Sequence, residues 1–508
     1  MTTKKQFFTG GIMLATVALL MRGVSLAFNA YVTKTVGAEG MGLLSLTMSV
    51  YGFAVTFATA GVSLAVTRLV AAALGRAEGA RAKGVLRGAV IYALLFGGSA
   101  SFFLYFGSDF IALRLLADIR TRASLRLLSV SLLPIALSAV YSGYFIAVRR
   151  VLHNAVTQVF EQCTRIALTF GGLALAGGNV EYACLALVGG SSLAELFSFF
   201  LLFIQARVDL ARHKLFGGET GGEGRAVFRY AFPCAVSAQL RSGLVTVQHL
   251  LIPYALALGG AGRADALASY AAMHSMALPI VLFPTAILAA FSGLLVPECA
   301  ELEGSGRKGA LTRLCEKALF GALAFASLAA ALLYLGADTL GAAIYHSEEA
   351  GRYVRMLAPL VPIMYMDSVV DAHLKGLGYQ VYSMGVNIAD AAASVAGVLL
   401  LLPRFGAVGY IYVVYATEIL NFLLSIGKLL SLVRLPRRPY VWVIPPLCAL
   451  LAVLVGSLLI PAGGVFALIC RFFVGAGAYA LAVSLLYPYK NVPLALDKKQ
   501  GECYNVRQ

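Results

Sequence analysis

Four arginines lie inside long apolar stretches in the first half of the chain, where an unpaired charge is costly: Arg22, Arg68, Arg165 and Arg241. A charged side chain at the centre of a membrane helix costs about 2.5–3.5 kcal/mol on insertion scales. The guanidinium group binds phosphate through two parallel hydrogen bonds and stays charged at physiological pH. These residues therefore predict a water-filled path that binds a large anion, although Arg68, late in its stretch, can instead extend its head group to the membrane surface.

Polar neighbours at helical spacing extend this candidate substrate-binding site. Asn29 shares a helix face with Arg22, and Gln158, Glu161 and Arg165 share another. Glu161 and Arg165 are four residues apart with the acid first, which is the favourable order for an ion pair on a helix. Such a pair can be a self-neutralising structural pair or a substrate contact, and the sequence leaves both interpretations open.

The second half of the chain carries acids in its apolar stretches instead: Asp367, Asp371, Asp390 and Glu418. Carboxylates in such surroundings are expected either to bind a coupling cation or to balance the charge of the arginines. The 6 histidines and 8 cysteines have no spacing typical of a metal site. We therefore expect neither a metal nor a cofactor.

The composition indicates the solvent in which these residues lie. Of the 508 residues, 60% are apolar and 13% are charged, whereas soluble domains have about 25% charged residues. So few charges cannot cover a soluble surface, which excludes a soluble enzyme and predicts an integral membrane protein. The net charge of +16 is typical of basic cytoplasmic loops, and no stretch forms the basic patch that nucleic-acid binding would need.

Apolar runs long enough to span a bilayer recur along the whole chain. Fourteen are expected, at residues 6–33, 41–74, 88–107, 123–148, 154–176, 182–206, 229–257, 266–297, 314–336, 353–374, 379–402, 406–430, 440–460 and 464–487. Most Lys and Arg residues fall on one side if both termini are cytoplasmic, so the positive-inside rule predicts that topology in the cell membrane. The exception is Arg114–Arg126, a basic stretch on the outer side.

The chain also repeats part of itself. An acid heads similar apolar sequences at Glu195 and Glu418, and polar residues share one helix face both in 154–165 and in 383–394. This pattern predicts an all-α polytopic protein with two pseudo-symmetric six-helix lobes, and such repeats usually enclose the substrate site. The expected parts are lobes of residues 1–224 and 225–435, an extra helix pair at 436–488 and a cytoplasmic tail at 489–508.

Motifs of catalytic domains are missing from the sequence. There is no GxxxxGK[ST] and no HExxH, and the GxGxxG match at Gly304–Gly309 follows an expected helix where dinucleotide binding needs a strand. The longest polar stretch, of about 25 residues, is too short for a catalytic domain. We therefore expect no enzyme. A membrane glycosyltransferase would need an acidic metal-binding loop, and the loops here are short and basic.

Short motifs in a fixed order support a more specific interpretation. They are Met21–Gly23, Gly61–Arg68, Glu161–Arg165, Leu295–Glu298, Lys375–Gln380 and Leu402–Tyr410. Together they resemble the MOP (multidrug/oligosaccharidyl-lipid/polysaccharide) exporter superfamily. Within it, the chain is most similar to polysaccharide biosynthesis flippases of the stage V sporulation protein B type, which are related to lipid II flippases.

The resemblance implies two lobes plus two extra helices that alternate between inward-open and outward-open states without ATP hydrolysis. It implies a polyprenyl-pyrophosphate-linked saccharide as substrate, a cell-wall or polysaccharide precursor, with Arg22 and Arg68 at positions thought to meet the pyrophosphate. Gly23 and Gln248 depart from the pattern, because related flippases carry acids there. We expect a monomer in contact with membrane lipids and working beside cell-envelope synthesis enzymes. The alternatives are a drug/cation antiporter of the same superfamily and a non-transporting membrane scaffold.

Overall fold

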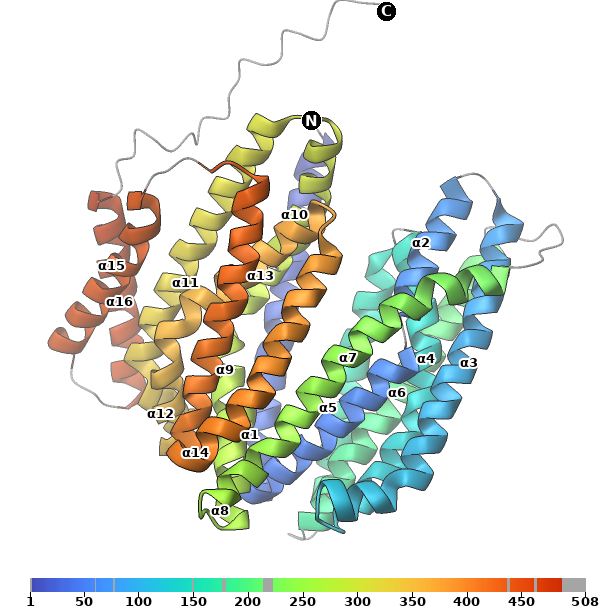
Figure 1. Ribbon diagram of the computed structural model, residues 1–508, viewed down its shortest axis with the longest axis horizontal. Helices are drawn as coiled ribbons and strands as arrows, with labels where there is room; N and C mark the ends of the chain where they lie inside the picture. Colours follow the sequence, from blue (N-terminus) through green and yellow to red (C-terminus); the bar gives the residue numbers. More distant parts are fainter. Residues whose placement is uncertain are drawn as a thin grey trace, which may run out of the picture.

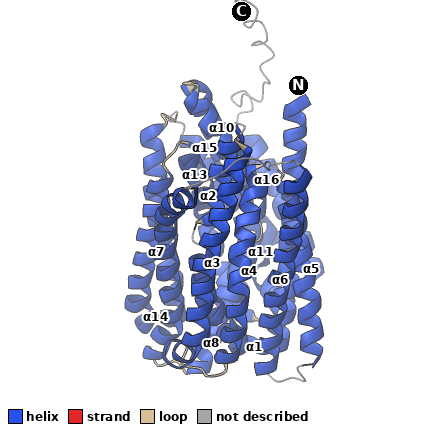
Figure 2. Cartoon of the chain, turned by 90° about the vertical axis from the view of Figure 1, so that its right-hand side faces the viewer, coloured by secondary structure: helices blue, strands red, loops and turns tan. Residues whose placement is uncertain are grey.

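The computed structural model describes residues 2–59, 61–75, 78–148, 150–175, 180–212, 223–435, 439–460 and 464–486. Every regular element in these ranges is a helix (Figure 2). In chain order they are α1 (Thr2–Thr59), α2 (Val62–Gly75), α3 (Gly79–Phe110), η1 (Ile111–Leu115), α4 (Thr121–Ala147), α5 (Val151–Leu175), α6 (Val180–Arg212), α7 (Glu223–Leu258), α8 (Arg263–Ala271), η2 (Ala272–Ala277), α9 (Leu278–Leu282), α10 (Thr285–Gly304), α11 (Lys308–Tyr345), α12 (Glu348–Leu357), η3 (Ala358–Leu360), α13 (Val361–Gly376), α14 (Gln380–Leu432), α15 (Pro439–Leu459) and α16 (Val465–Leu486).

The fourteen expected runs correspond to fourteen helical segments in the described part of the chain. The two longest helices each break at a glycine, α1 at Gly37 (φ 80°) and α14 at Gly406 (φ 60°). α14 holds the eleventh and twelfth runs, whereas α1 holds the first run and the beginning of the second, which continues into α2. These positive φ angles lie in the left-handed region that glycine adopts without strain. The eighth run is interrupted, and its pieces are α8, the π-helix η2, α9 and α10.

Ten stretches of the described residues are long and apolar enough to cross a membrane, and two of them each contain two of the expected runs. The protein is therefore a multi-pass membrane protein. Only α5 and α7 among the expected spans fall outside this set. They hold Glu161, Arg165 and Arg241, three of the predicted site residues.

The helices form two groups that stand side by side (Figure 1). The first consists of α2–α6 and the second of α8–α14, with α15 and α16 packed against α11 at the outer edge of the second. The groups approach each other at the end where α8 lies and stand apart at the end that carries the N-terminus. The two groups therefore lie closest together at the end that carries α8.

Two helices cross from one group to the other. The first part of α1 packs against α10, η2 and α11, and beyond Gly37 the same helix contacts α3 and α4 of the first group. α7 starts beside α3 and ends beside α8 and α14. Gly88 and Gly224 meet so closely there that a Cβ on Gly88 would lie 2.7 Å from the Gly224 Cα. α1, from the first half of the chain, therefore reaches the second helix group, and α7, from the second half, reaches the first.

Proline has different effects in the seventh and eighth runs. α7 continues through Pro233 and Pro253 as one curved helix, whereas α9 ends in a turn at Phe283–Pro284. Neighbouring helices tolerate a proline within a membrane helix when they satisfy the freed carbonyl groups. The expected cytoplasmic tail, residues 489–508, lies outside the described residues.

Candidate functional site

Arg22 has an unusual set of partners for an arginine inside an apolar helix. Its Nη1 donates a hydrogen bond of 2.8 Å to the hydroxyl of Thr285, at the start of α10. That hydroxyl donates in turn to the carbonyl oxygen of Leu282, at 2.6 Å. No carboxylate forms an ion pair with Arg22 among the described residues. Its charge is therefore oriented by a neutral group and remains available to an anion.

Asn29, two turns further along α1, fixes this part of the helix to the second group. Its Nδ2 donates to the carbonyl oxygen of Ser275 at 2.8 Å and to the hydroxyl of Tyr345 at 3.2 Å. Both partners lie on the second group, on η2 and α11. Since these bonds use both N–H donors of the amide, Asn29 is better suited to positioning α1 than to binding a ligand.

Arg68 lies at the contact between α2 and α7. Its guanidinium stands over the ring of Tyr230, 4.8 Å from the centroid, and it also donates a hydrogen bond to the Tyr230 hydroxyl. The residue is exposed. This arrangement holds the charge near an aromatic face without neutralising it, so a role at the membrane surface and a role in anion binding both remain compatible with it.

Arg165 is enclosed by acids. Its Nη2 lies 2.6 Å from Glu161 Oε1 on α5 and 3.4 Å from Glu195 Oε1 on α6. The sequence identified Glu161 as a partner, but it placed Glu195 only at the head of a repeated apolar stretch. The neighbouring Gln162 donates from Nε2 to Ser25 Oγ at 3.3 Å, which joins this cluster to α1. Gln158, one turn before Glu161, is exposed.

Among the acids of the second half, Asp371 forms an ion pair with Lys375 at the end of α13. Lys375 Nζ lies 2.5 Å from Asp371 Oδ2, and the hydroxyl of Ser383 donates to the other carboxylate oxygen. Asp367, one turn earlier, accepts a hydrogen bond of 3.4 Å from the amide of Asn421. Asp371 is thus paired with a cation, whereas Asp367, which also forms a hydrogen bond with Ser425, has no ion pair among the described residues.

Asp390 and Glu418 lie on the two parts of α14 and interact electrostatically with each other and with Arg241 on α7. The side chain of Thr417 forms a hydrogen bond with the carboxylate of Asp390. One carboxylate oxygen of Asp390 and one of Asp367 are nevertheless buried without a hydrogen-bond partner in the described part of the chain. Buried polar atoms are normally satisfied, so these two oxygens are positions where a proton or a cation would be stabilised.

The four arginines therefore do not form a single basic wall. Arg165 and Arg241 lie beside acids, whereas Arg22 and Arg68 contact hydroxyl groups and an aromatic ring. The described residues contain no group of three or more His, Cys, Asp or Glu side chains arranged to hold a metal ion. Thr285 and Tyr230 had no signal in the sequence, because a hydroxyl partner follows no spacing rule.

Comparison with known proteins gives the same architecture. The chain is 23% identical over 420 residues to stage V sporulation protein B of Bacillus subtilis (strain 168), which covers 79% of each protein. Its fold is similar to that of the lipid II flippase MurJ in an inward closed conformation, with a TM-score of 0.73 and 13% identity over 94% of this chain and 99% of that one. It is also similar to an inward-facing multidrug resistance MATE family transporter of the MOP superfamily, with a TM-score of 0.65 and 15% identity over 82% of this chain and 98% of that one.

These folds are those of transporters rather than of catalytic domains. Residues 7–297, more than half of the chain, match the family model of the polysaccharide biosynthesis proteins. The protein belongs to the polysaccharide biosynthesis protein family.

Proposed function

We propose that this protein is a flippase that moves a polyprenyl-pyrophosphate-linked saccharide across the cell membrane by alternating access. The family match, the similarity to stage V sporulation protein B and the fold shared with MurJ support a lipid-linked precursor as cargo. In Figure 1 the two helix groups meet at the end that carries α8 and stand farther apart at the N-terminal end, an asymmetry that an alternating-access transporter is expected to have.

The surroundings of Arg22 are the observation that best supports this proposal. A guanidinium held in a membrane-spanning helix by one hydroxyl, with no acid paired to it among the described residues, needs an anion to offset its desolvation. A pyrophosphate offers several negative oxygens, and each charged hydrogen bond contributes about 1.5–3 kcal/mol. The Thr285 hydroxyl orients the guanidinium and leaves its other N–H groups free for the ligand.

The second-half acids support a coupled transport cycle. Asp367 and Asp390 each retain a buried oxygen without a partner in the described structure, and taking up a proton or a cation there would satisfy it. The same observation favours the second candidate function, a drug/cation antiporter of the superfamily. Such a protein would use these acids to exchange a proton or sodium ion for an organic cation, and it would have no need for the charge of Arg22.

Flipping assays in proteoliposomes would separate these functions. Purified protein is reconstituted with a panel of fluorescent polyprenyl-pyrophosphate saccharides and, separately, with cationic dyes. We expect saccharide-lipid flipping by the wild type, a loss of about 10- to 100-fold in Arg22→Ala, the factor of one charged hydrogen bond, and partial activity in Arg22→Lys, since an ammonium lacks the planar fork.

Arg471→Ala is the matched control. Arg471 is also an arginine in a membrane helix, but it donates to the backbone oxygens of Ile460 and Leu335, at 2.9 Å and 3.2 Å, at the outer edge of the second group. Its loss should lower thermal stability and leave flipping per folded molecule unchanged. If the protein transports the cationic dyes but flips no saccharide lipid, and Arg22→Ala does not change dye transport, the antiporter is the correct function and the flippase is not. A stable Arg22→Ala protein with full flipping activity would exclude Arg22 from the site.

A further inference from the structure

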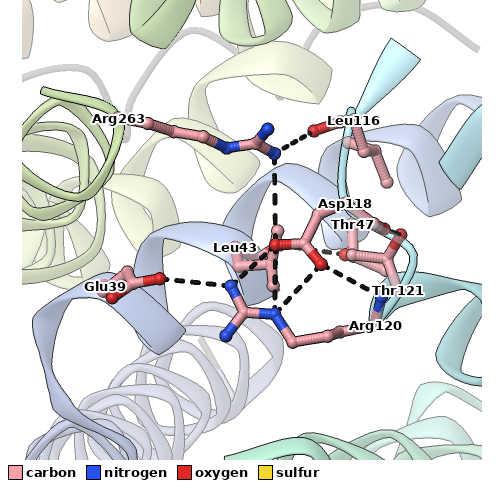
Figure 3. A network of polar contacts seen from close by, with 8 residues as sticks. All are labelled: Glu39, Leu43, Thr47, Leu116, Asp118, Arg120, Thr121 and Arg263. Atoms are coloured by element: carbon pink, nitrogen blue, oxygen red, sulfur yellow. Dashed lines mark hydrogen bonds and ion pairs between the residues drawn. The ribbon is translucent and has the colours of Figure 1, made fainter. Parts of the chain in front are cut away.

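At the end where the two helix groups meet, four charged side chains form one network (Figure 3). Arg120 Nη2 lies 2.7 Å from Asp118 Oδ2 and 3.1 Å from Glu39 Oε1. Arg263 Nη2 donates a hydrogen bond of 2.9 Å to the carbonyl oxygen of Leu116 and lies 4.0 Å from Asp118 Oδ2. Two carboxylates thus face two guanidinium groups, and the network has no net charge.

The members of the network come from three separate parts of the fold. Glu39 follows the break of α1 at Gly37, Asp118 and Arg120 lie between η1 and α4, and Arg263 is the first residue of α8. η1 and α4 belong to the first helix group, and α8 belongs to the second. Arg263 is therefore a direct tie between the groups. Glu39, on the part of α1 that follows Gly37, pairs with Arg120 on the side of the first group.

The rest of the basic stretch Arg114–Arg126 explains why the network is specific. Arg122 and Arg126 both form ion pairs with Asp109 on α3, inside the first group. Arg120 instead pairs with Asp118, the carboxylate that Arg263 of the second group approaches.

The backbones are in close contact at the same place. A Cβ on Gly42 of α1 would lie 2.3 Å from the carbonyl oxygen of Leu267 on α8, so no side chain fits there. The cavity beneath Arg120, lined also by Thr47 and Ser124, has a volume of about 10 Å³, enough for about one water molecule. This end is thus closed by backbone contact as well as by charge.

Asp118 is the member that keeps the network ionised. Burial acts to raise the pKa of its carboxyl group, but the hydrogen bonds and charge of Arg120 outweigh burial and lower the pKa overall. The carboxylate is therefore ionised at neutral pH, and both guanidinium groups have a charged partner.

We propose that Glu39, Asp118, Arg120 and Arg263 form a charge latch, which holds the two helix groups together at this end and separates when the path opens there. When the groups part, Glu39, Asp118 and Arg120 stay together with the first group, while Arg263 leaves Asp118 and the Leu116 carbonyl oxygen and passes into water. The side chains of Glu39, Arg120 and Arg263 are already 48%, 41% and 52% exposed, so little desolvation has to be reversed. A contact of this strength favours one state without trapping it.

The latch rests on the alternating access of the proposed function, but not on the identity of the cargo, and a distance measurement can test it without substrate. Spin labels are attached through Ile119→Cys and Ala261→Cys, both at exposed positions, in a variant whose native cysteines are replaced. Pulsed electron paramagnetic resonance in lipid nanodiscs then reports the separation of the two groups at this end.

We expect one main short distance when the latch is intact. Arg263→Gln should raise the ratio of the long-distance to the short-distance population about two- to fivefold, the factor for loss of an exposed charged contact. Arg263→Lys should give an intermediate ratio. Arg122→Gln removes the same charge from the same end and should leave the distribution unchanged, because its partner Asp109 lies within the first group.

Equal distributions in Arg263→Gln, Arg122→Gln and the unsubstituted labelled protein would overturn the latch. Gly42→Ala is a second route to the same state, since the added methyl group must push α1 and α8 apart, and it should increase the long-distance population even with all four charges present. If saccharide lipids are not flipped but Arg263→Gln still shifts the distances, the proposed cargo fails and the latch stands. If flipping is observed and no variant shifts the distances, the latch fails and the function stands.

Discussion

Charged groups inside the two helix groups are arranged in opposite ways. On α5 and α6, Arg165 lies between Glu161 and Glu195, so the positive charge is shared by two acids that both contact it. On α13 and α14, Asp367 and Asp390 each keep a buried oxygen with no partner in the described structure. In the first cluster both carboxylates contact the cation, and the atom left without a hydrogen-bond partner in the described structure is a donor, the buried Nε of Arg165. In the second cluster the unpartnered atoms are acceptors, which can take up a proton or a cation.

This difference separates a structural role from a functional one. A polar atom left unsatisfied in a buried position costs about 1–3 kcal/mol, so it persists where a ligand or proton fills it during the working cycle. In the first cluster the unpartnered Nε–H belongs to an arginine that already contacts two carboxylates, and a donor of this kind cannot take up a proton or a cation. We therefore expect the cluster on α5 and α6 to be mainly structural, and the acids on α13 and α14 to be the groups that change their charge.

The largest effect is expected from breaking the first cluster. Arg165→Ala leaves Glu161 and Glu195 facing each other without their cation, and breaking a buried pair costs about 3–5 kcal/mol. We expect a value near 3 kcal/mol, because these side chains keep partial access to water. The apparent melting temperature in detergent, compared with that of the wild type, measures this loss.

The control replaces the whole cluster rather than one member. Arg165→Met combined with Glu161→Gln and Glu195→Gln removes all three charges and should recover most of the lost stability, since no uncompensated charge remains. Flipping by this triple variant at near wild-type rates would confirm the structural role. A stable triple variant that no longer flips would instead make the cluster a substrate contact.

A smaller, purely functional effect is expected in the second group. Asp390→Asn preserves the shape of the side chain and its bond to Thr417 but removes the negative charge. Stability should change by less than about 0.5 kcal/mol, as for substitutions that break no strong contact, while transport driven by a proton or sodium gradient should fall about tenfold, the equivalent of 1.4 kcal/mol. Gradient-driven flipping in proteoliposomes measures the coupling.

Asp338→Asn is the matched control, because Asp338 is an exposed acid of the same helix group paired with Arg355. It should leave the response to the gradient unchanged. Equal activity of Asp390→Asn with and without a gradient, combined with wild-type dependence in Asp338→Asn, would confirm the assignment. Full gradient dependence in Asp390→Asn would leave these acids with a charge-balancing role only.

The sequence predicted the arrangement of helices better than the contacts between them. Runs of apolar residues indicated the fourteen segments, because each span must satisfy its own backbone inside the membrane. The partners of the charges depend on helix packing, which the runs do not encode. Glu195 was seen only as the start of a repeat, and the latch joins residues as far apart as Leu116 and Arg263. The approach of Gly42 to Leu267 had no signal at all, since one glycine in an apolar run is common.

The smallest effect is expected from the pair that most resembles Glu161–Arg165. Asp371 and Lys375 are also four residues apart with the acid first, at 2.5 Å, but no second acid contacts Lys375 in the described structure, and its side chain is 44% exposed against 27% for Arg165. An exposed helical pair contributes about 0.3–0.5 kcal/mol and is screened by salt. Lys375→Gln should therefore lower stability by no more than that, and the difference from the wild type should vanish in about 1 M salt. Asp371 keeps the hydrogen bond from Ser383, so its carboxylate still has a donor after the substitution. Melting temperatures at low and high salt measure the effect.

A loss as large as that of Arg165→Ala would show that the second group also depends on ion pairs for its stability, and the contrast between the two groups would then disappear.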